Sequence, residues 1–130
     1  MVDPSHTDSL TPPMIFATDQ TVAMHRLAPQ VESRGFESLW VTEKTHVPVS
    51  RQTAWPGGEL PEWYKRTCDP FIALATAAAT TTTLRLGTGV ALLALCNPVI
   101  TPKTIATLDW QSGGRLELGV GYGWNAWCRS

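Results

Sequence analysis

The hydrophobic positions of this chain follow two patterns, short continuous runs and longer segments whose apolar residues lie three or four apart. The short runs predict buried strands at residues 14–19, 36–41, 84–93 and 116–121. The spaced segments between them predict helices, so the order is β-α-β-α-β-α-β. This alternation predicts a parallel sheet with right-handed crossovers. An open doubly wound sheet and part of a closed eight-stranded barrel are both compatible with it.

Capping residues mark the helix boundaries. The first helix has apolar residues between positions 24 and 31 and is expected to close at Gly35. Pro29 lies inside it and is expected to kink or shorten it, because an interior proline costs about 3 kcal/mol. Asp-Pro at 69–70 and Asn-Pro at 97–98 each combine an N-cap with proline at the first helical position, so they predict the second and third helix starts.

Two segments stand outside this alternation. Residues 1–13 are polar and rich in proline, and we expect a disordered leader before a domain that occupies 14–130. Residues 43–68 form a long connection that carries Trp55, Trp63 and Tyr64. Connections of this length are usually lids, binding loops or disordered, and the aromatic residues argue against disorder. A purely structural ordered loop is the alternative.

The third and fourth strands share a sequence pattern, LRLGTGV and LELGVGY. If they are neighbours in the register of that match, Arg85 faces Glu117 and the two side chains form a buried ion pair. The alternative is that both lie near the strand starts, in water.

Charge, hydropathy and cysteine content indicate which kinds of partner and environment suit the protein. The formal net charge is -1, which favours neither nucleic acid nor an anionic membrane as a partner. The longest apolar runs are far shorter than the roughly 20 residues of a membrane span. Cys68, Cys96 and Cys128 form no CxxC pair, so we expect inert thiols, no metal site and a reducing cytoplasm.

Polar residues and glycines collect after the strands, where parallel α/β folds bind ligands. Glu43, Lys44 and His46 follow the second strand, and a carboxylate, an ammonium and an imidazole this close together suit proton transfer, although a solvated loop start is the plainer interpretation. Glycine pairs at 87–89 and 119–121 leave space for a flat ligand or for close backbone packing. GVGYGW has tryptophan where the dinucleotide fingerprint needs its third glycine, and no Walker lysine is present.

Three stretches together resemble the luciferase-like monooxygenase superfamily, and within it the oxidoreductases that use the deazaflavin coenzyme F420. They are GFESLWVTEKTHVP, DPFIALATAAATTTTLRLGTGV and NPVITPKTIATLDWQSGGRLELGVGYGWN. The resemblance extends over residues 14–125 in unbroken order. It implies a (β/α)8 TIM barrel, of which this chain would form the N-terminal half, about four βα units, truncated after strand four.

The resemblance also implies site residues. Glu43 matches an acidic residue that contacts the coenzyme, and Lys44 stands where relatives commonly have a histidine that contacts the coenzyme or transfers a proton. His46 is usual in this subgroup, so Lys44 and His46 are the implied catalytic residues. Gly89 and Val90 match a non-proline cis peptide beside the coenzyme ring.

The implied coenzyme contacts continue after strand four. In relatives that loop borders the coenzyme, which here implies contacts from Gly121, Tyr122, Gly123 and Asn125. Cys96 replaces an arginine that relatives often have before the Asn-Pro pair. Phosphate-binding loops of such barrels follow strands seven and eight, beyond these four units.

The implied activity is hydride transfer or monooxygenation of a small organic substrate, with coenzyme F420 or, alternatively, FMN. The competing expectation is a non-catalytic half-barrel that dimerises or aggregates, since four strands leave edges and an apolar face uncovered.

Overall fold

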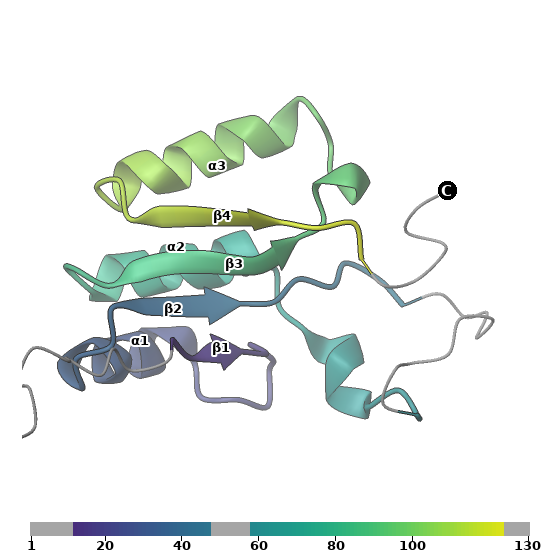
Figure 1. Cartoon of the computed structure of the whole chain (residues 1–130), viewed down its shortest axis with the longest axis horizontal. Coiled ribbons are helices and arrows are strands. Elements are labelled where there is room, and N and C mark those ends of the chain that lie inside the picture. The colour runs from purple at the N-terminus through teal and green to yellow at the C-terminus, as the bar shows by residue number, and fades with distance from the viewer. Residues whose placement is uncertain (1–11, 48–57, 124–130) are drawn as a thin grey trace, which may run out of the picture.

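A computed structural model of the chain describes residues 12–47 and 58–123, which form one parallel sheet with helices packed against it (Figure 1). The strands are β1 (Met14–Ile15), β2 (Ser38–Val41), β3 (Arg85–Ala91) and β4 (Leu116–Val120), paired in that order. The helices are α1 (Met24–Ser33), α2 (Pro70–Thr80) and α3 (Ile100–Gln111), with short 3-10 turns η1 (Glu62–Arg66) and η2 (Leu93–Leu95).

The core lies between one face of the sheet and the three helices. Leu39, Val41 and Leu86 of the strands are fully buried, and they share one apolar cluster with residues of α1, α2 and α3. Because side chains alternate along a strand, Trp40 lies on the opposite face. Strands in chain order with helices on one face form an arc of a closed barrel, whereas a doubly wound sheet reverses its strand order. The half-barrel prediction is confirmed.

The predicted helix caps are present, with shifts of a few residues. The Asp69 carboxylate accepts a hydrogen bond from the Ile72 N–H (2.9 Å) and caps α2. The Asn97 side chain accepts from the Val99 and Ile100 N–H groups, so α3 begins at Ile100 rather than at residue 98. Pro29 does not shorten α1, which continues to Ser33.

The first strand and the third–fourth strand register differ from expectation. β1 contains two residues rather than six. In β3 and β4, Glu117 pairs with Gly87 instead of Arg85, a displacement of two residues. Residues two apart share a face, so Arg85 and Glu117 still form an ion pair, but Arg85 is 64% exposed. The prediction of a buried, directly opposed pair is therefore wrong, since the matching letters did not determine the hydrogen-bond register.

Glu32 at the end of α1 joins that helix to the connection between α2 and β3. Its Oε1 accepts hydrogen bonds from the Thr82, Thr83 and Leu84 N–H groups (2.9, 2.7 and 2.9 Å) and from the Thr83 hydroxyl. These donors, the Thr83 N–H most of all, lower the pKa of Glu32 to about 2. The carboxylate thus stabilises the amino end of β3 in its charged form.

This depressed pKa predicts a pH-dependent stability. The contribution of Glu32 is fully present above the pKa of the unfolded chain, near 4.5, and is lost as pH falls toward 2. We expect the urea midpoint of the wild type to exceed that of Glu32→Gln at pH 6, and the difference to shrink steadily below pH 4.5. Glu59→Gln, at an exposed position, should show no such convergence. A wild-type advantage that persisted at pH 2 would contradict the assignment.

Candidate functional site

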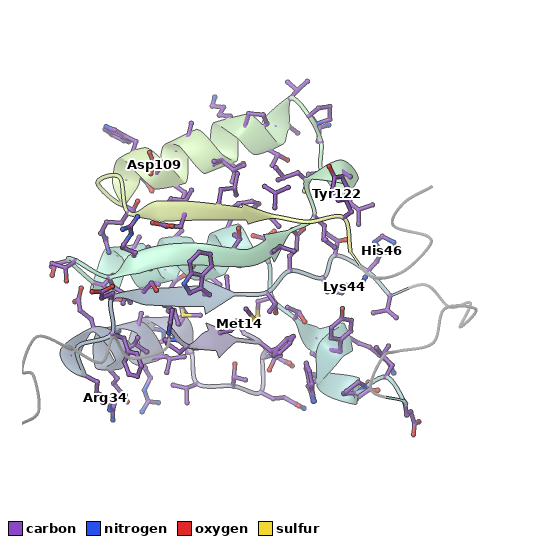
Figure 2. The ribbon with its side chains drawn as sticks, viewed as in Figure 1. Met14, Arg34, Lys44, His46, Asp109 and Tyr122 are labelled. Carbon is purple, nitrogen blue, oxygen red and sulfur yellow. The ribbon has the colours of Figure 1, made fainter. Side chains whose placement is uncertain are left out.

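The carboxyl ends of the four strands meet at one edge of the sheet and surround a hollow of about 410 Å³. Figure 2 shows Lys44, His46 and Tyr122 at this edge, with Arg34 and Asp109 at the opposite end. The lining comes from the ends of all four strands and from η1. It consists of Phe16, Thr42, Glu43, Lys44, Tyr64, Gly89, Val90, Leu92, Gly121, Tyr122 and Gly123.

Seven of the nine predicted site residues line this hollow. They are Glu43, Lys44, Gly89, Val90, Gly121, Tyr122 and Gly123. His46 does not line it, because its side chain is exposed and its Nδ1 lies 3.1 Å from the Thr45 hydroxyl. Asn125 lies outside the described residues. Sequence reasoning thus located one edge of the sheet and most of the residues that line one hollow there.

Glu43 is the half-buried acidic group of the hollow. Its Oε2 accepts a hydrogen bond from the Leu92 N–H (2.5 Å), and its Oε1 lies 4.0 Å from the Cys96 sulfur. Burial raises the pKa of Glu43, against the lowering effect of the Leu92 N–H. Burial, and then the charge of Glu43, also raises the pKa of Cys96 and disfavours its thiolate.

One wall of the hollow is formed by the ends of β3 and β4. The Gly89–Val90 peptide bond is cis, as the resemblance implies. The Gly121 N–H donates to the Ala91 carbonyl (3.0 Å), beyond a break in the register after Thr88. A Cβ at Gly121 would overlap the Val90 side chain, so glycine permits this close packing. The result is a wall of backbone and one small apolar side chain.

The facing wall is aromatic. Phe16 lies 4.5 Å from Trp63 and 6.4 Å from Tyr64 between ring centroids, and Trp63 lies 6.0 Å from Tyr64. The Lys44 ammonium lies 6.0 Å from the Tyr64 ring centroid. The sequence marks Trp63 and Tyr64 as aromatic residues of the long connection, whereas no local pattern marks Phe16 as a site residue.

Contacts distant in sequence hold η1 against the end of β1. Arg66 forms a two-pronged ion pair with Asp19, in which Nε donates to Oδ1 at 2.8 Å, and this pairing lowers the pKa of Asp19. The Cys68 N–H donates to the Ala17 carbonyl (2.7 Å), and Thr18 forms an antiparallel bridge with Thr67. The aromatic wall is therefore fixed by backbone pairing as well as by side chains.

Thr42 provides a polar group that points to a ligand. Its hydroxyl oxygen is buried and has no hydrogen-bond partner in the described part of the chain. Buried polar groups are nearly always paired, so an unpaired hydroxyl in a residue that borders a hollow suits a ligand group as its partner. A planar heterocycle with N–H and C=O groups at its edge suits this lining, because a smooth apolar wall lies beside Thr42 and Glu43. The residues present are compatible with a flavin-type ring.

The remaining features of the described residues concern metal-binding groups, long apolar helices and cysteines. Within residues 12–47 and 58–123, no group of three His, Cys, Asp or Glu side chains is arranged to hold a metal ion. The helices in those ranges are all too short or too polar to cross a membrane. Cys68 and Cys96 are unpaired thiols, and Cys128 falls outside the described residues.

Several known proteins are similar to this chain in sequence. The chain is 43% identical over 116 residues to an uncharacterized protein of Mycobacterium tuberculosis, covering 86% of this chain and 41% of that relative. It is 35% identical over 97 residues to 4-hydroxyprotoasukamycin monooxygenase of Streptomyces nodosus subsp. asukaensis, covering 75% of this chain and 22% of the enzyme. The chain thus spans less than half the length of these relatives.

Solved structures have the same arrangement of strands and helices. The coenzyme F420-dependent tetrahydromethanopterin reductase from Methanopyrus kandleri matches with a TM-score of 0.62 at 29% identity, over 85% of this chain and 26% of that one. The oxygenating constituent of 3,6-diketocamphane monooxygenase from Pseudomonas putida, solved in complex with FMN, matches with a TM-score of 0.65 at 20% identity, over 88% of this chain and 30% of that one. The latter likeness concerns the fold alone.

The family model of the luciferase-like monooxygenases matches residues 4–127, nearly the whole chain. Together with the parallel half-barrel and the hollow at its carboxyl edge, this match shows that the chain belongs to the luciferase-like monooxygenase family.

Proposed function

We propose that the hollow binds the ring of coenzyme F420, with FMN as the alternative, and that the protein acts as an oxidoreductase on a small organic substrate. The observation that carries the proposal is the convergence of the β2, β3 and β4 ends on one hollow of about 410 Å³. The bound coenzyme would supply hydride transfer, or oxygen activation in the case of FMN. The protein supplies position and electrostatics.

Each part of the lining has a distinct task in this proposal. Val90 and the Gly121–Gly123 backbone provide the surface against which the ring packs. The Thr42 hydroxyl, unpaired among the described residues, and the Glu43 carboxylate form hydrogen bonds to the polar edge of the ring. Lys44 carries charge within the hollow, and His46 at its margin is the second candidate for moving a proton. The ends of β2, β3 and β4 hold the ring, while phosphate binding belongs to later loops of such barrels.

Two facts support F420 before FMN. The Methanopyrus kandleri reductase, named as F420-dependent, is 29% identical to this chain and matches over 85% of it. The segment from β2 to β4 also carries the residues that resemble the deazaflavin-dependent subgroup. Coenzyme preference is therefore a direct test of the proposal.

The test is a fluorescence titration of F420 with the 130-residue chain. We expect saturable quenching, and we expect Glu43→Gln to weaken binding about tenfold, because one charge-assisted hydrogen bond to the ring is lost. Glu37→Gln is the matched control, since Glu37 is exposed before the amino end of β2 and should leave binding unchanged. Tighter binding of FMN would assign the flavin instead. Absence of binding by either coenzyme would refute the ring site in this chain.

The open face of the sheet favours a second candidate, a self-associating half-barrel. Parallel sheets are normally covered on both faces. Here Met14 on β1 is 61% exposed on the open face, and Leu118 and Val120 on the outer strand β4 are 39% and 52% exposed on the helix-covered face, which is therefore also incompletely covered at β4. We propose that two copies cover these apolar edges, since each copy offers one such edge from β1 and one from β4.

Light scattering after size-exclusion chromatography tests this association. A folded dimer or larger species at micromolar concentration is expected, and Val120→Lys should shift the distribution toward monomer, whereas Val99→Lys, on the exposed approach to α3, should not. A folded wild-type monomer at these concentrations would exclude the proposed association.

A further inference from the structure

The aromatic wall faces the proposed ring-binding wall across the same hollow, and its chemistry is different. Phe16 and Tyr64 line the hollow, with Trp63 packed against both of them. Tyr64 is 7% exposed, so its ring is packed into the fold and the Phe16–Tyr64 surface has a fixed position. Aromatic side chains favour offset or edge contacts with other rings, worth about tenfold in affinity for one well-placed ring.

This wall is preformed. The Asp19–Arg66 ion pair and the Cys68–Ala17 hydrogen bond hold the C-terminal end of the 3-10 turn against the end of β1. The Thr67 hydroxyl also donates to the Tyr64 carbonyl (3.0 Å), which closes the turn on itself. A ligand that packs here therefore meets rings already in place, and little conformational entropy is lost on binding.

Lys44 gives the wall a positive charge. The residue is only 9% exposed, its ammonium lies over the Tyr64 ring, and it lines the hollow. A cation drawn out of water interacts strongly with an anionic group that reaches it, because the low local polarity strengthens the attraction. Lys44 adjoins Glu43 in sequence, so the charged residues of the hollow follow β2, while the aromatic wall comes from the residue after β1 and from η1.

We propose that this side of the hollow is a substrate subsite for a planar aromatic compound that bears an acidic group. The ring of the ligand packs against Phe16 and Tyr64, and its anionic group is held by Lys44. The identification of this ligand as substrate rests on the proposed function, whereas its binding does not require the coenzyme. A sugar or polyol is a poorer match, because most of the surface beside Lys44 lacks the hydrogen-bonding groups that hydroxyls need.

Three small probes test the subsite on the 130-residue chain without coenzyme. Benzoate has a planar ring and a charge, benzamide keeps the ring without the charge, and cyclohexanecarboxylate keeps the charge without the planar ring. Their dissociation constants are measured by ligand-observed saturation-transfer NMR. We expect benzoate to bind about tenfold more tightly than either of the others. Equal binding of benzoate and benzamide would overturn the role of charge, and equal binding of the two carboxylates would overturn the role of the aromatic wall.

Variants assign the charge preference to Lys44. Lys44→Met is expected to abolish the preference for benzoate over benzamide, and Lys44→Arg to retain most of it. Lys103→Met is the matched control, because Lys103 is exposed on α3 and should leave the preference intact. A preference that survived Lys44→Met would overturn the assignment. If a Lys44 variant failed to fold, the three probes on the wild type would still decide whether the subsite exists.

The two proposals can fail separately. Benzoate selectivity without F420 or FMN binding would support the subsite and refute the coenzyme assignment. Coenzyme binding without benzoate selectivity would do the reverse.

Discussion

Replacing Arg115 by methionine is expected to lower the free energy of unfolding by about 3 kcal/mol, because it removes a set of charge-assisted hydrogen bonds. The Arg115 guanidinium donates to the carbonyls of Ala78 (2.9 Å) and Leu84 (3.0 Å), and to both the carbonyl and the hydroxyl of Thr81. Its Nε donates to the Ser112 carbonyl (2.6 Å). One side chain thus closes the end of α2 and joins it to the start of β4.

The loss arises from carbonyl groups that the methionine cannot satisfy. The last turn of a helix has no internal donors for its carbonyls, and those of α2 are partly buried under this side chain. Lysine would restore the charge but not the planar fork of donors, so Arg115→Lys should recover less than half of the loss.

Urea unfolding followed by far-UV circular dichroism measures the effect. Arg34→Met is the matched control, because Arg34 is exposed and, within residues 12–47 and 58–123, its guanidinium donates only to the carbonyl and side chain of Gln30, one helical turn earlier. Its cost should stay below about 0.5 kcal/mol. Equal losses for the two variants would show that the Arg115 network contributes nothing beyond an ordinary surface arginine.

The role of Arg115 illustrates what local sequence patterns can and cannot predict. The turn at residues 112–115 is evident from two consecutive glycines, and both adopt positive φ angles there, 71° and 76°. The partners of Arg115 other than Ser112, by contrast, lie more than 30 residues away in sequence. Capping signals such as Asp69 and Asn97 are local, because the side chain bonds the backbone two or three residues ahead. They predicted the start of α2 and, to within two residues, the start of α3.

The register of β3 and β4 shows a second limit. The repeated letters suggested that Arg85 faces Glu117, yet the hydrogen-bond ladder is displaced by two residues and breaks between Thr88 and Ala91. Alternation of buried and exposed side chains fixes which face a residue lies on, but a displacement of two preserves that face. The sequence pattern therefore predicted the face and not the pairing.

Some residues of the candidate site were also predictable from local sequence, and others were not. Glu43, Lys44, the glycine near the end of β3 and the glycines after β4 were predictable, because the carboxyl ends of parallel strands converge on one edge. The aromatic wall was not, because its place depends on the Asp19–Arg66 pair, whose members are 47 residues apart. No feature of the EWYKR segment indicates by itself where in the fold it docks.

Gly119 is where close packing in β4 is most demanding. A Cβ at this position would overlap the backbone oxygen of Thr88 on the neighbouring strand and approach the Trp40 ring. The Thr88 hydroxyl donates to the Gly119 carbonyl (2.8 Å), so the two residues are joined at the point where the register breaks. Backbone cannot move aside here without loss of strand pairing.

Gly119→Ala is therefore expected to reduce the free energy of unfolding by about 3 kcal/mol, at the upper end of overpacking costs. Gly35→Ala provides the comparison, because nothing lies within 4 Å of a Cβ there and only the positive φ of 81° opposes the substitution. That strain should cost about 1 kcal/mol. Urea unfolding of both variants separates crowding from backbone strain. A Gly119→Ala loss no larger than that of Gly35→Ala would mean that β4 does not pack this closely on β3.

Gly121 and Val90 lie just beyond Gly119, so a displacement of β4 in the Gly119→Ala variant should also weaken F420 binding, whereas Gly35→Ala should not.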